Sequence, residues 1–199
     1  MQPAQLNSIP ISDGILQYAP SFIPSEEATD LLEKLIECID WRQEEMKMFG
    51  KIVQFPRLTA WYGDPEATYR YSGTTFQPTP WIPALLSLRE KIQQAVNHPF
   101  NSVLLNYYRD GQDSMGWHAD NEKELGRNPV IASLNLGASR PFQLKHNTLG
   151  GKQEIILEHG SLLIMGGFLQ HHWKHQIPKR KKIQKPRINL TFRQILKTT

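Results

Sequence analysis

The sequence contains very little cysteine: Cys38 is its single cysteine among 199 residues. A lone cysteine excludes an internal disulfide and is typical of proteins from a reducing compartment. As a nucleophile, Cys38 would need a neighbouring histidine or helix N-terminus, and the sequence shows neither. We therefore expect Cys38 to be a buried structural residue within a helix.

Long apolar runs are also lacking. No run is long enough to cross a bilayer, so no membrane partner is expected. The N-terminus lacks a basic start followed by an apolar stretch, which argues against a secretory signal. Hydrophobic residues make up 39% and charged residues 21% of the chain, a balance typical of a folded globular domain. The length suits one domain with a single core.

Positive charge is in modest excess, with a formal net charge of +4. Its distribution is uneven, because five basic residues crowd into seven positions: Lys179, Arg180, Lys181, Lys182 and Lys185. Such a run suits nucleic-acid phosphates, but an ordinary solvated loop would look the same. The run alone leaves both interpretations open.

The N-terminal half predicts an irregular arm over residues 1–20 and then two helices. Ser25 is a plausible N-cap, and apolar residues at helical spacing predict a helix from there to about Asp40. A second helix is expected over residues 83–97, with Pro83 in its first turn.

The C-terminal half has the pattern of short strands separated by turns. Strands are expected over residues 102–108, 131–136, 141–145, 155–157, 161–165 and 187–195. Strands do not alternate regularly with helices, so a doubly wound sheet is not expected. The fold class predicted from the residues is α+β, with a sandwich or barrel core.

A candidate metal site begins at His118-Ala119-Asp120. Two ligands at i and i+2 of an extended segment share a face. A third ligand must come from elsewhere, and His171, His172 and His175 are all candidates. Two histidines and one carboxylate bind one face of a non-haem iron and leave three positions open. A zinc site with the same ligands remains an alternative.

The closing strand, residues 187–193, alternates polar and apolar residues. Arg187, Asn189, Thr191 and Arg193 share one face, which is either a solvated edge or a polar wall inside a barrel. In the second case an arginine there would bind a carboxylate with two hydrogen bonds. Asn106 shows the same parity in the strand before His118, together with Tyr108.

The combined motifs resemble the AlkB family of Fe(II)- and 2-oxoglutarate-dependent dioxygenases. They are Asn106–Gly111, His118–Glu122, His175 and Pro186–Arg193, and the resemblance covers roughly residues 20–196. The branch with the second and third AlkB homologues is most similar. The segment Phe49–Lys51 and the stretch from Pro56-Arg57 to Tyr71–Gly73 point to the duplex-acting second homologue in particular.

The resemblance implies a double-stranded β-helix, or jelly roll, with buttressing N-terminal helices and a substrate-binding hairpin lid at about residues 41–75. Residues 21–199 would form the one dioxygenase domain. His118, Asp120 and His175 would ligate Fe(II). Arg187 would bind the distal carboxylate of 2-oxoglutarate, and four further residues would complete that pocket: Asn106, Tyr108, Thr191 and Arg193.

The implied reaction consumes 2-oxoglutarate and O2 and hydroxylates an N-alkyl carbon, releasing formaldehyde, succinate and CO2. 1-Methyladenine and 3-methylcytosine are the expected kinds of lesion, and the base must be flipped out of a duplex. The substrate-binding residues implied by the resemblance are Phe49, Gly50, Lys51, Tyr69, Arg70, Tyr71, Asn121 and Glu122. Tyr71 departs from the second homologue, which has phenylalanine there, so lesion preference is open.

The Met48-Phe49-Gly50 segment has two interpretations. Phenylalanine is usually a core residue, but the resemblance implies a wedge at a hairpin tip that fills the gap left by the flipped base. Arg180, Lys181 and Lys182 would then contact the DNA backbone. We expect a monomer that acts on double-stranded or single-stranded DNA in a bacterial cytoplasm or eukaryotic nucleus. An RNA demethylase and an inactive relative that only binds damaged DNA are the alternatives.

Overall fold

The computed structural model describes residues 5–48, 50–71 and 74–196. It describes the side chains of these residues except at 46–48, 51, 69–71, 74 and 75. Within these ranges, no helix is both long and apolar enough to cross a membrane.

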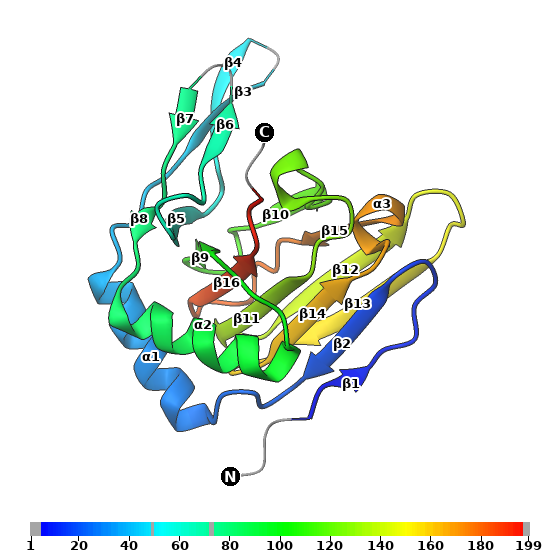
Figure 1. The fold of residues 1–199 in the computed structure, drawn as a ribbon, viewed down its shortest axis with the longest axis horizontal. Helices are drawn as coiled ribbons and strands as arrows, with labels where there is room; N and C mark the ends of the chain where they lie inside the picture. The colour runs from blue at the N-terminus through cyan, green and yellow to red at the C-terminus, as the bar shows by residue number, and fades with distance from the viewer. Residues whose placement is uncertain (1–4, 49, 72–73, 197–199) are drawn as a thin grey trace.

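Two β-sheets form the body of the molecule (Figure 1). The larger sheet has the order β1-β2-β14-β11-β16-β9-β5-β8, and only β5 and β8 pair in parallel. Its strands are β1 (Asn7–Ser8), β2 (Ile15–Ala19), β5 (Leu58–Gly63), β8 (Thr79–Pro80), β9 (Ser102–Tyr108), β11 (Ile131–Gly137), β14 (Leu162–Gly166) and β16 (Arg187–Arg193). The smaller sheet has the order β10-β15-β12-β13, with β10 (Met115–His118), β12 (Arg140–His146), β13 (Lys152–Leu157) and β15 (Trp173–Ile177).

Two helices, α1 (Ser25–Cys38) and α2 (Pro83–Val96), lie over one face of the larger sheet (Figure 1). Pro83 begins α2 as expected, and Asn97 ends it in the left-handed conformation. The expected Ser25 cap is wrong: Pro24 precedes the helix, and Ser25 is its first residue. Proline has no side-chain acceptor, so no side chain caps this end. Cys38 is exposed, not buried, because α1 turns Ala28 and Leu35 towards the sheet.

The larger sheet separates two apolar clusters. On its helix-covered face, alternate residues of β11 and β16 pack beneath α1 and α2, among them Leu134, Leu190 and Phe192. On the other face, Tyr108 and Leu163 pack towards the smaller sheet, which contributes Phe142, Leu144 and Trp173. The intervening residues of β11 and β16 therefore point into the space between the sheets. This arrangement agrees with the expected α+β jelly roll.

The N-terminal segment is more regular than expected. Ile15–Ala19 pairs with β14 along its whole length, and Leu16 is buried between the sheets. The expectation of an irregular arm over residues 1–20 is wrong for this segment. The partner strand lies more than 140 residues away in the chain, so local sequence carries no signal of the pairing.

Two hairpins project from the body within the region expected to form the lid (Figure 1). The first pairs β3 (Glu45–Met48) with β4 (Lys51–Gln54), and the second pairs β6 (Tyr69–Tyr71) with β7 (Thr74–Phe76). Gly50 lies at the tip of the first hairpin with φ +78°, a conformation that favours glycine. Phe49 lies outside the described residues.

Candidate metal centre and active site

Strand pairing brings together the ends of two segments that carry His118, Asp120 and His175. His118 ends β10 and faces His175 of β15 in the sheet register. Asp120 follows two residues later, and its Oδ2 lies 3.8 Å from Nε2 of His175. Ligand atoms from all three residues lie within 4.8 Å of one another. The structure therefore gathers the three side chains that the sequence predicted as ligands.

The protonation states of these groups suit metal binding. Burial lowers the pKa of His175 to about 3, so its imidazole is neutral near pH 7. Burial alone would raise the pKa of Asp120, but electrostatic interaction with the Arg193 guanidinium, and after it with His175 and His118, outweighs burial and lowers that pKa. Nδ1 of His118 lies 2.9 Å from the carbonyl oxygen of Gly116, to which it donates. That tautomer leaves Nε2 of His118 free as a ligand.

The other two histidines considered from the sequence lie elsewhere. His171 approaches the carbonyl oxygen of Arg127 and the side chain of Asn128. His172 stacks on His146, with ring centroids 5.8 Å apart. Both belong to the short helix α3 (Leu169–His172) before β15. Only His175, among the three, joins His118 and Asp120 within the described part of the chain.

Arg187 begins β16 and points between the sheets, opposite Tyr108 of β9. The residue is only 1% exposed. Burial lowers its pKa to about 10, which still leaves the guanidinium charged near neutral pH. Nη2 donates to Oδ1 of Asn135, while Nε and Nη1 have no hydrogen-bond partner among the described residues. A buried cation with unused donors is the complement of a carboxylate ligand.

A cavity between the sheets joins Arg187 to the candidate metal ligands. Its lining includes Asn106, Tyr108, His118, Asp120, Ser133, His175, Arg187, Asn189, Thr191 and Arg193. The closing strand is thus a polar wall of an internal cavity and not a solvated edge. The cavity thus contains a carboxylate among the candidate metal ligands and unused guanidinium donors on Arg187, an arrangement that suits a metal bound beside a dicarboxylic oxoacid.

Comparison with known proteins agrees with this geometry. The model of the 2OG-Fe(II) oxygenase superfamily matches residues 15–193. The chain is 41% identical over 182 residues to human DNA oxidative demethylase ALKBH2, covering 87% of this chain and 70% of that protein. The chain belongs to the AlkB group of 2OG-Fe(II) oxygenases.

Other relatives extend the comparison. Mouse alpha-ketoglutarate-dependent dioxygenase alkB homolog 3 is 42% identical over 186 residues, which cover 88% of this chain. The chain spans 64% of the length of that relative. A solved structure described as that of OsALKBH1 superimposes with a TM-score of 0.64 at 18% identity. The match covers 94% of this chain and 100% of that one, which supports the jelly-roll fold.

Fe(II), 2-oxoglutarate and O2 are accordingly the cofactor and cosubstrates of this oxygenase family. The residues present fit them. His118, Asp120 and His175 offer two imidazoles and a carboxylate, the ligand set of non-haem iron oxygenases. Nδ1 of His175 is buried and has no partner in the described structure. The unused donors of Arg187 fit the distal carboxylate of 2-oxoglutarate.

The remaining predicted cofactor residues form a hydrogen-bonded wall around Arg187. Asn106 accepts a bond of 2.7 Å from Nε of Arg57. Thr191 donates to Asn189 over 3.0 Å. Arg193, also predicted for this pocket, lines the same cavity and pairs with the candidate metal ligand Asp120. Arg193 therefore lies next to the candidate metal ligands as well as the predicted cosubstrate pocket.

Several residues of this wall were missed in the sequence. Arg57 and Asn135 are both buried and bond to predicted pocket residues. Ser133 accepts from Asn189 at 2.7 Å. The signal that could have found Ser133 and Asn135 is parity, because they face Thr191 and Asn189 in register. Arg57 has no such parity signal, because it lies in the bend before β5 and not in a strand.

A second, larger cavity of about 500 Å³ shares Leu104 and Arg193 with the first. Its lining is aromatic and acidic: Glu44, Phe55, Trp61, Phe76, Ser102, Leu104, Glu122, Glu124, Leu125, Arg193 and Ile195. Glu122, predicted to bind substrate, is part of this wall, and its Oε2 is buried with no partner within the described ranges. Asn121, predicted with it, is exposed.

The other predicted substrate residues lie on the hairpins and the basic loop. Gly50 is exposed at its turn, whereas the side chains of Lys51, Tyr69, Arg70 and Tyr71 lie outside the described set. Their roles stay predictions. The basic loop lies between β15 and β16, and its residues Arg180, Lys181 and Lys182 are exposed. Backbone bonds between Gly111 and both Arg180 and Ile183 attach the loop to the turn after β9.

Proposed function

We propose that this chain is a DNA repair dioxygenase that oxidatively removes alkyl groups from N-alkylated bases such as 1-methyladenine and 3-methylcytosine. The observation that carries the proposal is a pair of cavities that share Leu104 and Arg193, the first of which contains the candidate ligands. One cavity holds the free donors of Arg187, and the other has acidic and aromatic walls. A relative named DNA oxidative demethylase, 41% identical, supports the same function.

The residues of the first cavity would prepare the reaction. Arg187 would bind the distal carboxylate of 2-oxoglutarate, and Asn135 holds its guanidinium in place. His118, Asp120 and His175 would hold Fe(II), which with 2-oxoglutarate and O2 supplies oxidation of an unactivated C–H bond. Burial of Asp120 and His175 keeps bulk water away from the reacting centre.

The charge of the second cavity favours an alkylated base over a normal one. Glu44, Glu122 and Glu124 bring three carboxylates to its wall. Alkylation at the ring nitrogens of 1-methyladenine or 3-methylcytosine leaves the base positively charged near neutral pH, whereas unmodified bases are neutral. Phe55 and Trp61 offer flat apolar surface for the ring. Coulomb attraction and stacking together would select the lesion.

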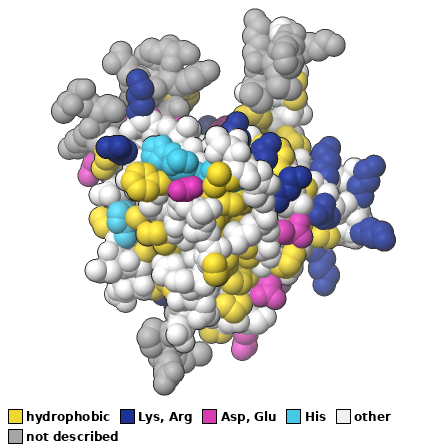
Figure 2. Space-filling view, turned by 90° about the vertical axis from the view of Figure 1, so that its right-hand side faces the viewer, with side chains coloured by type: hydrophobic (Ala, Val, Ile, Leu, Met, Phe, Trp, Pro, Cys, Tyr) yellow, Lys and Arg dark blue, Asp and Glu magenta, His cyan; other side chains and the backbone are white. Residues whose placement is uncertain are grey.

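Double-stranded DNA is the proposed form of the substrate. A flipped base needs something to stabilise the opened duplex, and the β3–β4 hairpin stands away from the body with Gly50 at its tip (Figure 1). The exposed basic loop, residues 179–185, adds positive charge for phosphate contacts. Figure 2 shows Lys and Arg side chains gathered at one edge of the face it presents. We also propose that the protein is a monomer and that it acts inside the cell, in a bacterial cytoplasm or a eukaryotic nucleus.

A single substrate panel tests the function. The same 1-methyladenine lesion would be placed in double-stranded DNA, single-stranded DNA and RNA of identical sequence. Formaldehyde and succinate would be measured with His118→Ala as the inactive control. We expect both products in equal amounts from DNA, fastest from the duplex. Faster turnover of RNA would indicate an RNA demethylase, and binding without products would indicate an inactive damaged-DNA-binding relative.

A further inference from the structure

Gln170 is a buried polar residue of α3 that none of the site assignments above uses. It is 2% exposed. Its Oε1 accepts a hydrogen bond of 2.9 Å from the main-chain N–H of Asp120, the carboxylate among the three candidate ligands. Its Nε2 lies 3.7 Å from the sulfur of Met165, a weak acceptor. The strong interaction of this side chain is therefore the one with Asp120.

The bond controls the backbone at a position where the chain has left the sheet. Asp120 follows β10, so no strand partner holds its N–H. A buried N–H without an acceptor is unfavourable, so the segment would move to find one. A small rotation there would carry the Asp120 carboxylate away from His118 and His175. Gln170 therefore fixes the direction of one ligand from a segment far away in sequence.

Helix α3 has only four residues, so its own hydrogen bonds cannot hold it. The turn at Ser12–Gly14 packs against it. Nε1 of Trp173, the residue directly after the helix, donates to the carbonyl oxygen of Ser12 over 2.8 Å. Gly14 lies so close to Leu169 that an added Cβ would be 2.9 Å from the Cβ of Leu169. The N-terminal turn thus touches both ends of α3.

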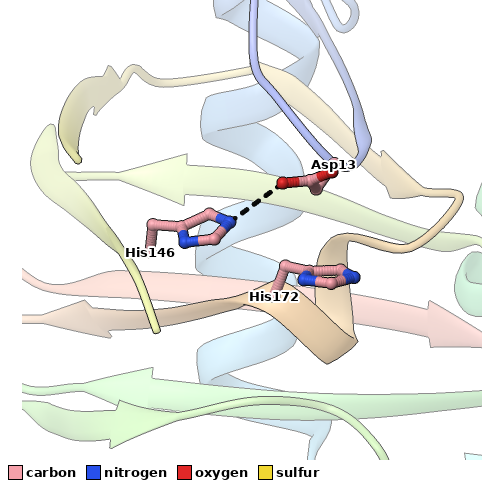
Figure 3. Close-up of side chains that lie close together, drawn as sticks. All are labelled: Asp13, His146 and His172. Atoms are coloured by element: carbon pink, nitrogen blue, oxygen red, sulfur yellow. Dashed lines mark hydrogen bonds and ion pairs between the residues drawn. The ribbon is translucent and has the colours of Figure 1, made fainter. Parts of the chain in front are cut away.

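Asp13, in the middle of this turn, closes the contact (Figure 3). Its Oδ2 lies 3.1 Å from Nε2 of His146, at the end of β12. The ring of His172, the last residue of α3, stacks on His146. Ligand atoms of the three side chains lie within 4.8 Å of one another, a spacing that would also suit a metal ion.

Hydrogen bonds at the other ring nitrogen argue against a metal here. Nδ1 of His146 accepts main-chain N–H groups from Leu149 at 2.9 Å and Thr148 at 3.2 Å. The ring proton must therefore be on Nε2, which donates it to Asp13. A metal ligand through Nε2 would need that proton removed while Nδ1 also lacks one. The cluster is a hydrogen-bonded latch between the N-terminal turn and β12.

We propose that Gln170 is a positioning residue for Asp120, and that the Ser12–Gly14 turn anchors the helix that carries it. The proposal depends on the metal site of this oxygenase family and not on the identity of the nucleic-acid substrate. Its test therefore uses metal binding in the absence of DNA, so that its failure is separate from a failure of the proposed demethylase activity.

The first experiment replaces the acceptor with an isosteric apolar side chain, Gln170→Met. The matched control is Gln93→Met, which removes a side-chain acceptor of the main-chain N–H of Phe100, away from Asp120 and the Ser12–Gly14 turn. We expect Gln170→Met to weaken CoCl2 binding about tenfold or more, to alter the visible Co(II) spectrum, and to speed hydrogen exchange at the Asp120 amide. The control should leave all three unchanged. Wild-type Co(II) affinity and spectrum in Gln170→Met would overturn the positioning role, even with a lowered melting temperature.

The second experiment breaks the latch without straining the backbone. Asp13 has φ +54°, which glycine and asparagine both tolerate. Asp13→Gly removes the acceptor, whereas Asp13→Asn keeps one for His146. We expect faster hydrogen exchange in α3 and weaker Co(II) binding for Asp13→Gly alone. Equal behaviour of both variants and the wild type would overturn the anchoring role. A second bound equivalent of Co(II) that Asp13→Asn or His172→Ala abolishes would show a metal site in place of the latch.

Discussion

Nη2 of Arg193 lies 2.6 Å from Oδ1 of Asp120, so a cation contacts the carboxylate that stands among the candidate metal ligands. Both side chains are largely buried. The pairing holds one carboxylate oxygen and leaves the other, Oδ2, turned towards His175. Arg193 therefore orients the ligand as well as balancing its charge.

Removing the carboxylate tests the metal assignment. We expect Asp120→Ala to abolish formaldehyde release and Co(II) binding. The domain should still fold, because an open metal site contributes little to its stability. The variant also leaves the buried charge of Arg193 without its partner, which lowers the free energy of unfolding. The double variant Asp120→Ala/Arg193→Met removes that cost and should restore thermal stability without restoring turnover. Wild-type turnover in either variant would show that Asp120 is not a ligand.

The cosubstrate site can be tested at Arg187. We expect Arg187→Leu to raise the half-saturating concentration of 2-oxoglutarate strongly, because truncating one member of a buried charged pair costs about 2–5 kcal/mol. Succinate formation is the measurement. Arg109→Leu is the matched control, since Arg109 forms a partly exposed ion pair with Asp113 outside the cavity. If the half-saturating concentration of 2-oxoglutarate were unchanged in Arg187→Leu, another cation would bind the distal carboxylate.

The acidic wall of the second cavity predicts selectivity for positively charged lesions. We expect Glu122→Gln to lower kcat/KM for 1-methyladenine about tenfold, or about 1.4 kcal/mol, because it removes a buried negative charge next to the base. Turnover of a neutral lesion, 1,N6-ethenoadenine, should fall much less. Glu33→Gln on the exposed face of α1 serves as the control. If kcat/KM fell equally for both lesions, Glu122 would not recognise the charge of the base.

The basic loop predicts a salt effect. Neutralising Lys181 and Lys182 should weaken DNA binding equally for all sequences, because phosphates carry no sequence information. Each lost phosphate contact should reduce the slope of log K against log salt by about 0.9. Lys34→Gln on α1 is the control. A slope that stays at the wild-type value would leave the loop as a solvated surface.

Phe49 lies outside the described residues, so its role rests on the sequence. We expect Phe49→Ala to slow repair of double-stranded methylated DNA about tenfold, about 1.4 kcal/mol of barrier, because a wedge offsets the cost of unstacking. Single-stranded DNA has little stack to break and should be affected far less. Ile52→Ala, an exposed apolar residue of the same hairpin, is the control. Equal losses on both substrates with a lower melting temperature would identify Phe49 as a core residue.

Part of the candidate site could be predicted from local sequence, because its residues lie in short motifs. His118 and Asp120 are two residues apart, and the alternation along β16 already separates the polar wall from the core. The choice of His175 over His171 and His172 could not follow from spacing alone. It depends on the register between β10 and β15, which pairs His118 with His175.

What the sequence could not predict depends on contacts between distant segments. The β2–β14 pairing and the Arg57–Asn106 bond join segments that no local pattern connects. Gln170 looks like any surface glutamine until the fold places Asp120 beside it. Cys38 was wrongly expected to be buried. The helical pattern of apolar residues predicted the helix, but it did not show that Cys38 lies off the face that packs against the sheet.

Strand β16 has a further consequence for how this protein tolerates mutation. Its even-numbered residues Ile188, Leu190 and Phe192 pack under the helices, and its odd-numbered residues line the active cavity. Side chains along the strand therefore alternate strictly between the two faces, with a period of two residues. A substitution at one position changes one face, whereas the loss of a single residue would turn every later side chain to the opposite face. The strand can therefore accept substitutions one position at a time, but not an insertion or a deletion.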